Sequence, residues 1–518
     1  MQSSTHEAKK RLLVNIGTNI LVVVVSALVG VWLTPYLIRH LGLELYGIIP
    51  LFLMISHYSE LFTLTIRGTV SRFVALSIGR NDFEKASLYF STAFFSLLTV
   101  YLLLLVPIIV IAIWLPKLFQ IPVGCESQAG NLFFLVILSS FMIGLSSPFM
   151  VSTFVKHRFD LGNLATILSR VFQVAILVLC FKFLSVSVTY FGLSRFGTAL
   201  VLLVSGIIFT RFLTPELHLR LVLFEFKAFR EMARMGGWIT LNEIGALLYL
   251  SIDLVVINIL LGPTQGGYYA PITQWVVLLN IFGTAISSVF APIVYEYIAK
   301  EDLETLAFQT QRAIKFMAMA MALPIGLICG LSEPLLERWL GPAFIKLSPL
   351  MWLLVAPCIV NLVVRPMFRI PTGMNKVRLP AIVTLAGGVA NLFVSILLVK
   401  YTSLGIYGVA LATVFCLTGK NMIFTPIYTA LIIKKPSTTF FKQLVTGIAL
   451  TAILSLGAWF LSNIYDLATI PRLVTTCALM AVVYCLLCYY LILSKAEKEF
   501  VRSIIVGYIK KGNADVRS

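Results

Sequence analysis

Long apolar runs separated by short charged segments dominate the pattern along this 518-residue chain. A helix of about 20 apolar residues crosses the hydrocarbon core of a bilayer, because it rises about 1.5 Å per residue. The pattern therefore predicts an all-α polytopic membrane protein with about fourteen transmembrane helices. Their expected ranges are 12–38, 45–66, 86–113, 131–153, 161–183, 187–212, 236–261, 267–293, 313–331, 349–372, 379–400, 405–433, 441–463 and 470–493.

The connections between the predicted helices are alternately rich and poor in Lys and Arg. The segment between the sixth and seventh helices holds Arg211, Arg220, Lys227, Arg230 and Arg234, whereas the next connection holds no basic residue. Cytoplasmic loops are enriched in Lys and Arg, so we expect a cytoplasmic (inner) membrane location with both termini cytoplasmic. The first run is too long for a signal-peptide core, and we interpret it as a retained first helix.

Composition supports the same class. Hydrophobic residues make up 59% of the chain and charged residues 12%, and the mean hydropathy is +0.96. Soluble chains carry about twice that charged share. The basic cytoplasmic segments account for the formal net charge of +18. The charge therefore does not indicate a nucleic-acid partner, and we expect none. The eight cysteines are scattered singly, without spacing typical of a zinc site or a disulfide framework.

One stretch of the chain occurs twice. Residues 41–84 align without gaps to 261–304 at a shift of 220. The matched pairs are Gly42 and Gly262, Gly47 and Gly267, Arg80 and Lys300, Asp82 and Asp302, and Glu84 and Glu304. Residues 147–163 then match 365–381 at a shift of 218. Such long-period similarity indicates a duplicated unit, and an even number of helices per unit makes the two repeats parallel.

The repeat suggests a division of the chain into five parts. These are an N-lobe with the first six helices (1–213), a cytoplasmic amphipathic linker (214–235), a C-lobe (236–433), two extra helices (434–493) and a basic cytoplasmic tail (494–518). In the linker, Arg220, Lys227 and Arg234 share one face of a helix over 215–235. That helix would lie on the membrane surface or serve as a solvated connector.

Motifs of enzymes are absent from the sequence. The string TGKN at 418–421 lacks the leading glycine and the hydroxyl of a phosphate-binding loop, and no HExxH motif occurs. We therefore expect a transporter rather than an enzyme, with no metal, no ATP site and no other cofactor. An ion gradient or the membrane potential would drive it.

Ionisable residues within the spans are the candidates for function, because burying charge in hydrocarbon is costly. In the second predicted span, His57, Glu60 and Arg67 share one helical face, and Arg72 lies nearer the cytoplasmic end. They would line a polar wall of a central cavity. The alternative is that Arg67 and Arg72 extend to the headgroups and that Glu60 is satisfied locally.

A second stripe lies in the seventh predicted span, where Asn242, Tyr249 and Asp253 share one face. Asp253 is a candidate for binding a coupling ion or a proton, and Glu60 is a second one. The alternative for Asp253 is a buried hydrogen bond to a neighbouring helix.

Further basic residues lie in other spans. Arg365 and Arg369 follow Asn361 in steps of four in the tenth, where Pro366 and Pro371 should break the helix. Arg170, Arg195 and Lys420 lie singly in the fifth, sixth and twelfth spans. Basic residues outnumber acidic ones within the spans. This excess suggests an anionic cargo, since arginine presents a planar fork suited to phosphate.

Four segments in order resemble a known family. LIRHLGLELYG, TVSRFVALSIGRNDFEKA, VKHRFDLGNL and SIDLVVINILLGPTQGGYYA are similar to polysaccharide flippases of the MOP exporter superfamily, in particular to the Wzx-like, O-antigen-type group. The resemblance implies two six-helix lobes around a central cavity that opens alternately to each side. It implies a cargo of undecaprenyl-pyrophosphate-linked oligosaccharide, moved from the inner to the outer leaflet for surface polysaccharide such as O-antigen lipopolysaccharide, capsule or exopolysaccharide.

The resemblance also implies roles for single residues and for partners. Arg72, in TVSRFVA, matches the arginine that family members carry at the end of the second span. Membrane lipids, a polysaccharide polymerase and chain-length machinery are the implied partners.

Two rival functions remain open from the sequence. A multidrug or metabolite exporter of the MATE type would need acidic cavity residues, for which Glu60, Glu243 and Asp253 are available. A glycan polymerase or ligase would need a large outer loop, and the loops near 114–130 and 332–348 look too small.

Overall fold

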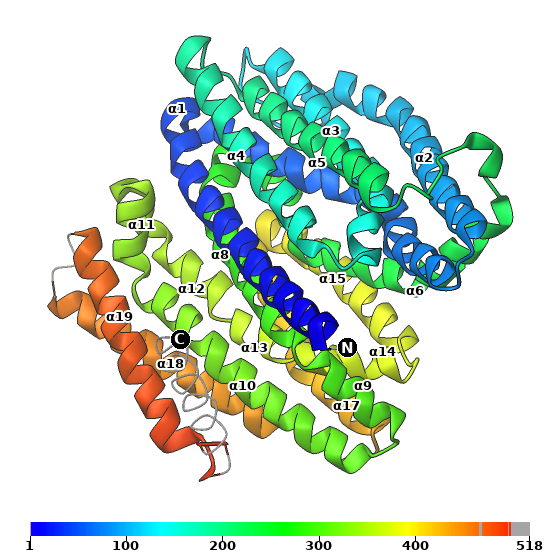
Figure 1. Ribbon diagram of the computed structural model, residues 1–518. Coiled ribbons are helices and arrows are strands. Elements are labelled where there is room, and N and C mark those ends of the chain that lie inside the picture. The colour runs from blue at the N-terminus through cyan, green and yellow to red at the C-terminus, as the bar shows by residue number, and fades with distance from the viewer. Residues whose placement is uncertain (1, 466–468, 496, 499–518) are drawn as a thin grey trace, which may run out of the picture. The chain divides into compact units, whose positions relative to one another are not determined.

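The computed structural model describes residues 2–465, 469–495, 497 and 498, without the side chains at 2–13, 16, 59, 62–65, 68, 235–239, 250 and 470. Every regular element in this part of the chain is a helix, as the apolar pattern predicts (Figure 1). The α-helices are α1 (Gln2–Gly79), α2 (Phe83–Leu118), α3 (Glu126–Val155), α4 (Phe159–Phe183), α5 (Val188–Leu213), α6 (Phe226–Leu250), α7 (Ile252–Leu261), α8 (Pro263–Ser288), α9 (Ala291–Ala299), α10 (Leu303–Gly330), α11 (Ser332–Leu340), α12 (Ser348–Val355), α13 (Cys358–Val363), α14 (Arg369–Gly373), α15 (Arg378–Tyr401), α16 (Ile406–Thr413), α17 (Thr425–Ile432), α18 (Phe441–Ile464) and α19 (Ile470–Leu487). The 3-10 helices are η1 (Leu221–Leu223), η2 (Pro342–Leu347) and η3 (Arg365–Phe368), and the π-helices are η4 (Val414–Thr418), η5 (Lys420–Phe424) and η6 (Cys488–Ile492).

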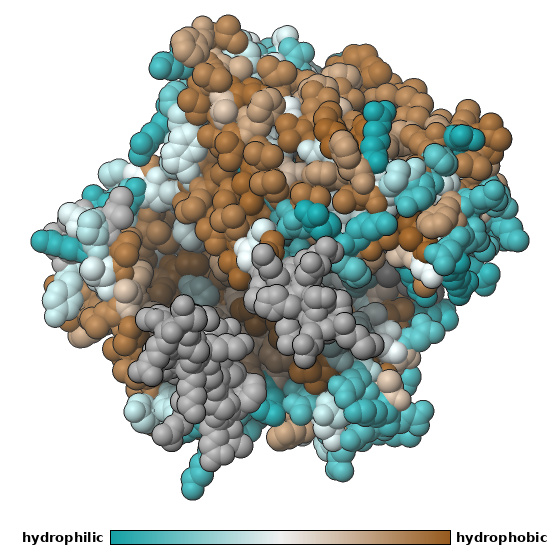
Figure 2. All heavy atoms as spheres, viewed as in Figure 1, coloured by the Kyte–Doolittle hydropathy of each residue, from teal (hydrophilic) through white to brown (hydrophobic). Residues whose placement is uncertain are grey.

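Thirteen helical stretches of the described chain are long and apolar enough to cross a membrane. They correspond to the fourteen expected ranges, because the stretch Gly17–Tyr58 contains parts of the first two. Large apolar side chains such as Leu103 and Ile453 are more than two-thirds exposed, which would be costly in water but suits lipid. Figure 2 shows a wide apolar area over α1 and α4. The protein is thus a multi-pass membrane protein.

The chain forms two compact units. The first comprises Met1–Phe282 with Phe368–Thr429, and the second comprises Gly283–Met367 with Ala430–Ser518. Within the first unit α3 packs against α5, and α6 packs against α15. Within the second unit α10 packs against α18. Each unit therefore draws its helices from two separate parts of the sequence.

The internal repeat is visible in the backbone. Gly42 (φ 79°, ψ 165°) interrupts α1, and its match Gly262 (φ 92°, ψ 169°) ends α7. Only glycine adopts this region readily, because it has no Cβ atom. The ends of the two repeated segments also agree. Asp82 and Asp302 each cap the following helix by accepting a hydrogen bond from the backbone N–H three residues further on. The repeated glycine and aspartate positions thus mark the same turns in both copies.

The repeated glycines Gly47 and Gly267 lie where the two copies cross. A Cβ atom on Gly47 would stand 2.1 Å from the carbonyl oxygen of Pro263, and one on Gly267 would stand 2.4 Å from the carbonyl oxygen of Leu43. Pro263 and Leu43 are themselves matched at the shift of 220, so the contact is reciprocal. Small residues let helix backbones approach this closely in a membrane. The crossing of α1 and α8 therefore depends on both glycines.

Two predicted spans are interrupted. The tenth expected helix consists of α12, α13, η3 and α14, consistent with Pro357, Pro366 and Pro371 lacking a backbone N–H. The seventh is divided into α6 and α7 at Ser251, which the sequence pattern did not indicate. Breaks of this kind free backbone groups inside a membrane and are tolerated where protein or water covers them.

The linker differs from the amphipathic helix expected over 215–235. Residues 214–225 contain only the short η1, and α6 begins at Phe226. The extended backbone is held by hydroxyl groups on α2. The Ser91 Oγ donates to the carbonyl of His218 (3.0 Å) and accepts from the Arg220 N–H (3.2 Å), while Ser87 and Thr92 bond to the same segment on either side. Because α2 satisfies these backbone groups, the segment has no need of helical hydrogen bonds.

We expect Ser91→Ala to loosen the linker. The change removes two hydrogen bonds and leaves two backbone groups without their partner, which should lower the free energy of local opening by about 1–3 kcal/mol. Amide hydrogen exchange over residues 216–225 should then accelerate about tenfold or more. Ser96→Ala is the matched control on α2, because the buried Ser96 Oγ has no partner among the described residues. Equal exchange in the two variants would contradict the role of Ser91.

The segment after α19 is attached to α10. Glu497 accepts from the Lys315 Nζ (2.6 Å) and from the Ser494 N–H (2.8 Å), and Arg312 lies 3.9 Å away. Burial alone would raise the pKa of Glu497. The hydrogen bonds from Lys315 and Ser494 together outweigh that effect, so the pKa lies below the ordinary value. The attachment is therefore strongest at neutral pH and weakens as pH falls through that pKa. The rest of the expected basic tail, 499–518, lies outside the described residues.

Candidate functional site

A charged cluster lies inside the first unit, contributed by α1, α4 and α5. On α1, the Arg67 Nη1 donates to the Glu60 Oε2 at 3.0 Å, and both side chains are about three-quarters buried. The seven-residue spacing of this pair agrees with the shared helical face inferred from the sequence. His57, on the same helix, lies within electrostatic range of Glu60 and Arg195. We call His57, Glu60, Arg67, Arg170 and Arg195 the arginine cluster.

The other two arginines of this cluster come from neighbouring helices. Arg195 on α5 lies within electrostatic range of Arg170 on α4 and of Glu60. The Arg170 Nη1 donates to the Gln173 Oε1 at 3.3 Å, and the Arg195 Nε is buried without a partner among the described residues. Arg67 thus pairs with Glu60, while Arg195 lies within range of both Glu60 and a second arginine, Arg170. Such an excess of buried positive charge is unfavourable unless an anion or water compensates it.

The sequence analysis did not connect these helices. It treated Arg170 and Arg195 as single residues in separate spans, and it did not identify Gln173. Arg72, the residue singled out by the family resemblance, has an exposed side chain on the last part of α1. The face that carries the cluster was recognisable on α1 alone, from the spacing of three and seven.

A second polar group surrounds Asp253 on α7. The Tyr269 Oη donates to the Asp253 Oδ2 at 2.7 Å, and the Thr413 Oγ1 lies 3.0 Å from the same oxygen and 3.2 Å from the Asn391 Oδ1. Asp253 and Asn391 are both buried, and the Asn391 Nδ2 donates to the carbonyl of Leu248. We call Asp253, Tyr269, Asn391 and Thr413 the Asp253 network. Four helices, α7, α8, α15 and α16, contribute to it.

A lysine lies near two aromatic rings in the same unit. The Lys420 Nζ donates to the Thr384 Oγ1 at 3.2 Å and lies 5.9 Å from the ring centre of Tyr249 and 5.7 Å from that of Phe368. Rings at this distance stabilise a cation through their negative faces. Lys420 begins η5, and π-helical turns are frequent at functional sites.

The remaining predicted residues lie elsewhere. Asn242 is half-buried on α6, before the interruption at Ser251. Arg365 belongs to the second unit, where its guanidinium donates to Thr284. Arg369 belongs to the first unit and begins α14, half-buried. Arg365 and Arg369, which the sequence places four residues apart in one predicted span, thus belong to different units.

Metal-binding groups are not apparent in the described residues. No group of three or more His, Cys, Asp or Glu side chains there could hold a metal ion, and the eight cysteines are free. The chemistry of the site consists of guanidinium, ammonium, hydroxyl, amide and carboxylate groups. Groups of these kinds can bind and orient charged ligands.

Comparison with known proteins shows what the chain is similar to. A model of the family described as "Polysaccharide biosynthesis protein" matches residues 12–298. The uncharacterized membrane protein EpsK of Bacillus subtilis (strain 168) is 28% identical over 494 residues, which cover 94% of this chain and 97% of EpsK.

Solved structures share the fold. The lipid II flippase MurJ in an inward closed conformation matches with a TM-score of 0.66 at 14% identity, over 92% of this chain and 99% of MurJ. An inward-facing multidrug resistance MATE family transporter of the MOP superfamily matches with a TM-score of 0.64 at 15% identity, over 85% of this chain and 99% of that chain.

Proposed function

The chain belongs to the polysaccharide biosynthesis protein family within the MOP exporter superfamily, and from this we propose that it is a flippase for a lipid-linked oligosaccharide. Its cargo would be an undecaprenyl-pyrophosphate-linked sugar unit, moved by alternating access from the inner to the outer leaflet of the cytoplasmic membrane. The moved unit would then serve a polymerase and chain-length machinery that build a surface polysaccharide.

The arginine cluster is the observation that carries this proposal. Three guanidinium groups with one carboxylate favour an anion, and a pyrophosphate accepts several charge-assisted hydrogen bonds from arginine forks. The Arg195 Nε, buried without a partner among the described residues, is a donor that a phosphate oxygen would satisfy. A cationic drug would be repelled by the same groups.

The Asp253 network supports an ion-coupled cycle. A buried carboxylate surrounded by two hydroxyls and an amide can exchange a proton or bind a small cation through its oxygens. Neutralising Asp253 would change the charge buried among four helices, and this change would link an ion gradient to a conformational change.

A deletion strain tests the function itself. We expect loss of one surface polysaccharide and accumulation of its lipid-linked precursor on the cytoplasmic face, measured by glycan staining and by labelling of accessible precursor. Unchanged polysaccharide together with new drug sensitivity would instead support a multidrug exporter.

Arg195→Gln tests the site. Loss of this charge should reduce flipping of a labelled lipid-linked oligosaccharide in proteoliposomes about tenfold, since a charge-assisted hydrogen bond contributes roughly 1.5–3 kcal/mol. Arg211→Gln is the control, because Arg211 is exposed on the last turn of the same helix. Equal flipping by the two variants, at equal amounts of folded protein, would exclude Arg195 from cargo binding.

A further inference from the structure

A set of hydrogen bonds joins the two copies of the repeat at one end of the first unit. The loop between α2 and α3 belongs to the first copy, and α7, which ends at the repeated glycine Gly262, belongs to the second. The Asn258 Nδ2 donates to the Gln120 carbonyl at 3.1 Å, and the Asn258 Oδ1 accepts from the Gln120 N–H at 3.0 Å. The Gln120 Nε2 also donates to the Ile259 carbonyl at 2.9 Å. We call these three hydrogen bonds the Asn258 latch.

The latch lies on the side of the membrane opposite the connections that are rich in Lys and Arg. The stretches Phe83–Leu118 and Thr240–Leu261 are each long and apolar enough to cross the bilayer. Each follows a basic connection, with Arg80 before the first stretch and Arg234 before the second. Their far ends therefore lie together on the other side, which we call the outer end, and the latch joins them there.

The chemistry of the latch allows it to hold and to open. Asn258 is only 2% exposed, and its amide both donates to and accepts from the same backbone residue. Gln120 is exposed on the loop. When the loop moves away, water can replace each hydrogen bond, so opening leaves no buried polar group without a partner.

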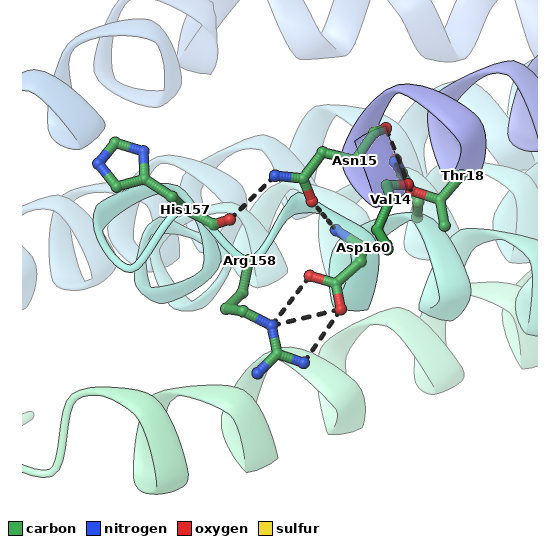
Figure 3. Close-up of polar contacts among 7 residues, drawn as sticks. Val14, Asn15, Thr18, His157, Arg158 and Asp160 are labelled. Atoms are coloured by element: carbon green, nitrogen blue, oxygen red, sulfur yellow. Dashed lines mark hydrogen bonds and ion pairs between the residues drawn. The ribbon is translucent and has the colours of Figure 1, made fainter. Parts of the chain in front are cut away.

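The same kind of asparagine pairing also occurs inside the first copy. The Asn15 Nδ2 donates to the His157 carbonyl and the Asn15 Oδ1 accepts from the Asp160 N–H, both at 3.0 Å (Figure 3). Arg158 donates to the Asp160 carboxylate and steadies the turn. This pairing ties α1 to the turn before α4, whereas the Asn258 latch ties elements of different copies.

That difference in position gives the two pairings different roles. In transporters built from repeats, alternating access is largely a rigid-body motion of one repeat against the other. Hydrogen bonds within one copy survive such a motion, but those between copies at a closed end must break before that end can open. The short helix α7 also carries Asp253, five residues before Asn258 and about 7.5 Å from it along the helix axis.

We propose that the Asn258 latch holds the outer end of the protein closed and opens once in each transport cycle. The latch presupposes the transport function proposed above, because it opens as part of a transport cycle. It assigns Asn258 and Gln120 to the conformational change and not to the binding of cargo.

The distance between two spin labels tests whether the latch holds the outer end closed. The purified full-length protein in lipid nanodiscs carries labels at Val123→Cys, in the loop, and at Tyr401→Cys, at the end of α15, after its eight native cysteines are replaced by serine or alanine. The native side chains at these positions are 98% and 80% exposed, so the labels disturb no packing. Asn258→Leu keeps a similar size but forms no hydrogen bonds, and it should raise the fraction of longer distances about threefold or more.

Two variants make the distances interpretable. Asn15→Leu makes the same substitution in the pairing inside the first copy, so it should leave the distances unchanged. Asn258→Asp can still accept from the Gln120 N–H but cannot donate to the Gln120 carbonyl, so it should give an intermediate fraction even if Asn258→Leu fails to fold. Equal distances in the Asn258 variants and in Asn15→Leu would overturn the latch.

A disulfide tests whether the latch opens in each cycle. Gln120→Cys with Asn258→Cys, oxidised in the same background, should stop flipping of a labelled lipid-linked oligosaccharide in proteoliposomes, and reduction should restore it. Flipping by the oxidised pair at the rate of the reduced pair would overturn the proposal. Absence of flipping by the unmodified protein would instead count against the flippase function, and the spin-label distances would still decide the latch.

Discussion

Gly47→Ala should prevent most of the protein from reaching its folded state in the membrane. The added methyl group would lie 2.1 Å from the Pro263 carbonyl oxygen and 2.9 Å from the Gly267 nitrogen, both of them backbone atoms that cannot rotate away. The helices would have to separate, which costs roughly 1–3 kcal/mol for ordinary overpacking and more against backbone. Size-exclusion profiles and thermal melting in detergent measure the loss.

Gly17→Ala is the control for this substitution. Gly17 lies on the same helix, and nothing stands within 4 Å of the position its Cβ would take. Alanine favours a helix over glycine by about 1 kcal/mol, so this variant should be as stable as the unmodified protein or slightly more so. A Gly47→Ala protein that melts like Gly17→Ala would show that α1 and α8 do not cross as closely as described.

Asp253→Asn should strongly reduce gradient-driven transport while leaving the protein folded. The amide oxygen can still accept from Tyr269 and Thr413, but the group no longer carries a charge or takes up a proton. We expect the transport rate under an imposed proton or sodium gradient to fall about a hundredfold, equivalent to about 2.7 kcal/mol. Binding of the lipid-linked cargo, measured without a gradient, should stay within about twofold of the unmodified protein, since a twofold change is only about 0.4 kcal/mol.

The control for Asp253 is Asp302→Asn. Asp302 caps α10 through the Thr305 N–H, and asparagine caps a helix equally well, so the same chemical change outside the network should be neutral. Tyr269→Phe, which removes one donor to Asp253, should give an intermediate loss. Full gradient-driven transport by Asp253→Asn would show that this carboxylate only makes a structural hydrogen bond, which is the alternative that the sequence left open.

The class of fold and the positions of the helices could be predicted from the sequence because both depend on local properties. A backbone in hydrocarbon must satisfy its own hydrogen bonds, so a run of about 20 apolar residues is expected to be mainly helical. Glycine also permits the positive φ found at the turns at Gly42 and Gly262, because it has no Cβ atom. The family resemblance rested on these ordered local segments.

The linker shows where local reasoning was insufficient. The spacing of Arg220, Lys227 and Arg234 suits an amphipathic helix, yet residues 214–225 are not α-helical. The hydroxyls of Ser87, Ser91 and Thr92 on α2 provide the backbone partners that a helix would otherwise supply. A sequence pattern cannot report such partners, because they lie about 130 residues away.

The candidate site also has a part that the sequence could predict and a part that it could not. The sequence by itself determined that this is an all-α, internally duplicated membrane protein, and it placed Glu60 and Arg67 on one helical face, because period and length are properties of a single segment. Only the tertiary structure decided that Arg170 and Arg195 join His57 and Glu60, and that Asp253 meets Thr413, which lies 160 residues further along the chain. Charges from different helices interact through space, and helix packing alone decides which of them become neighbours.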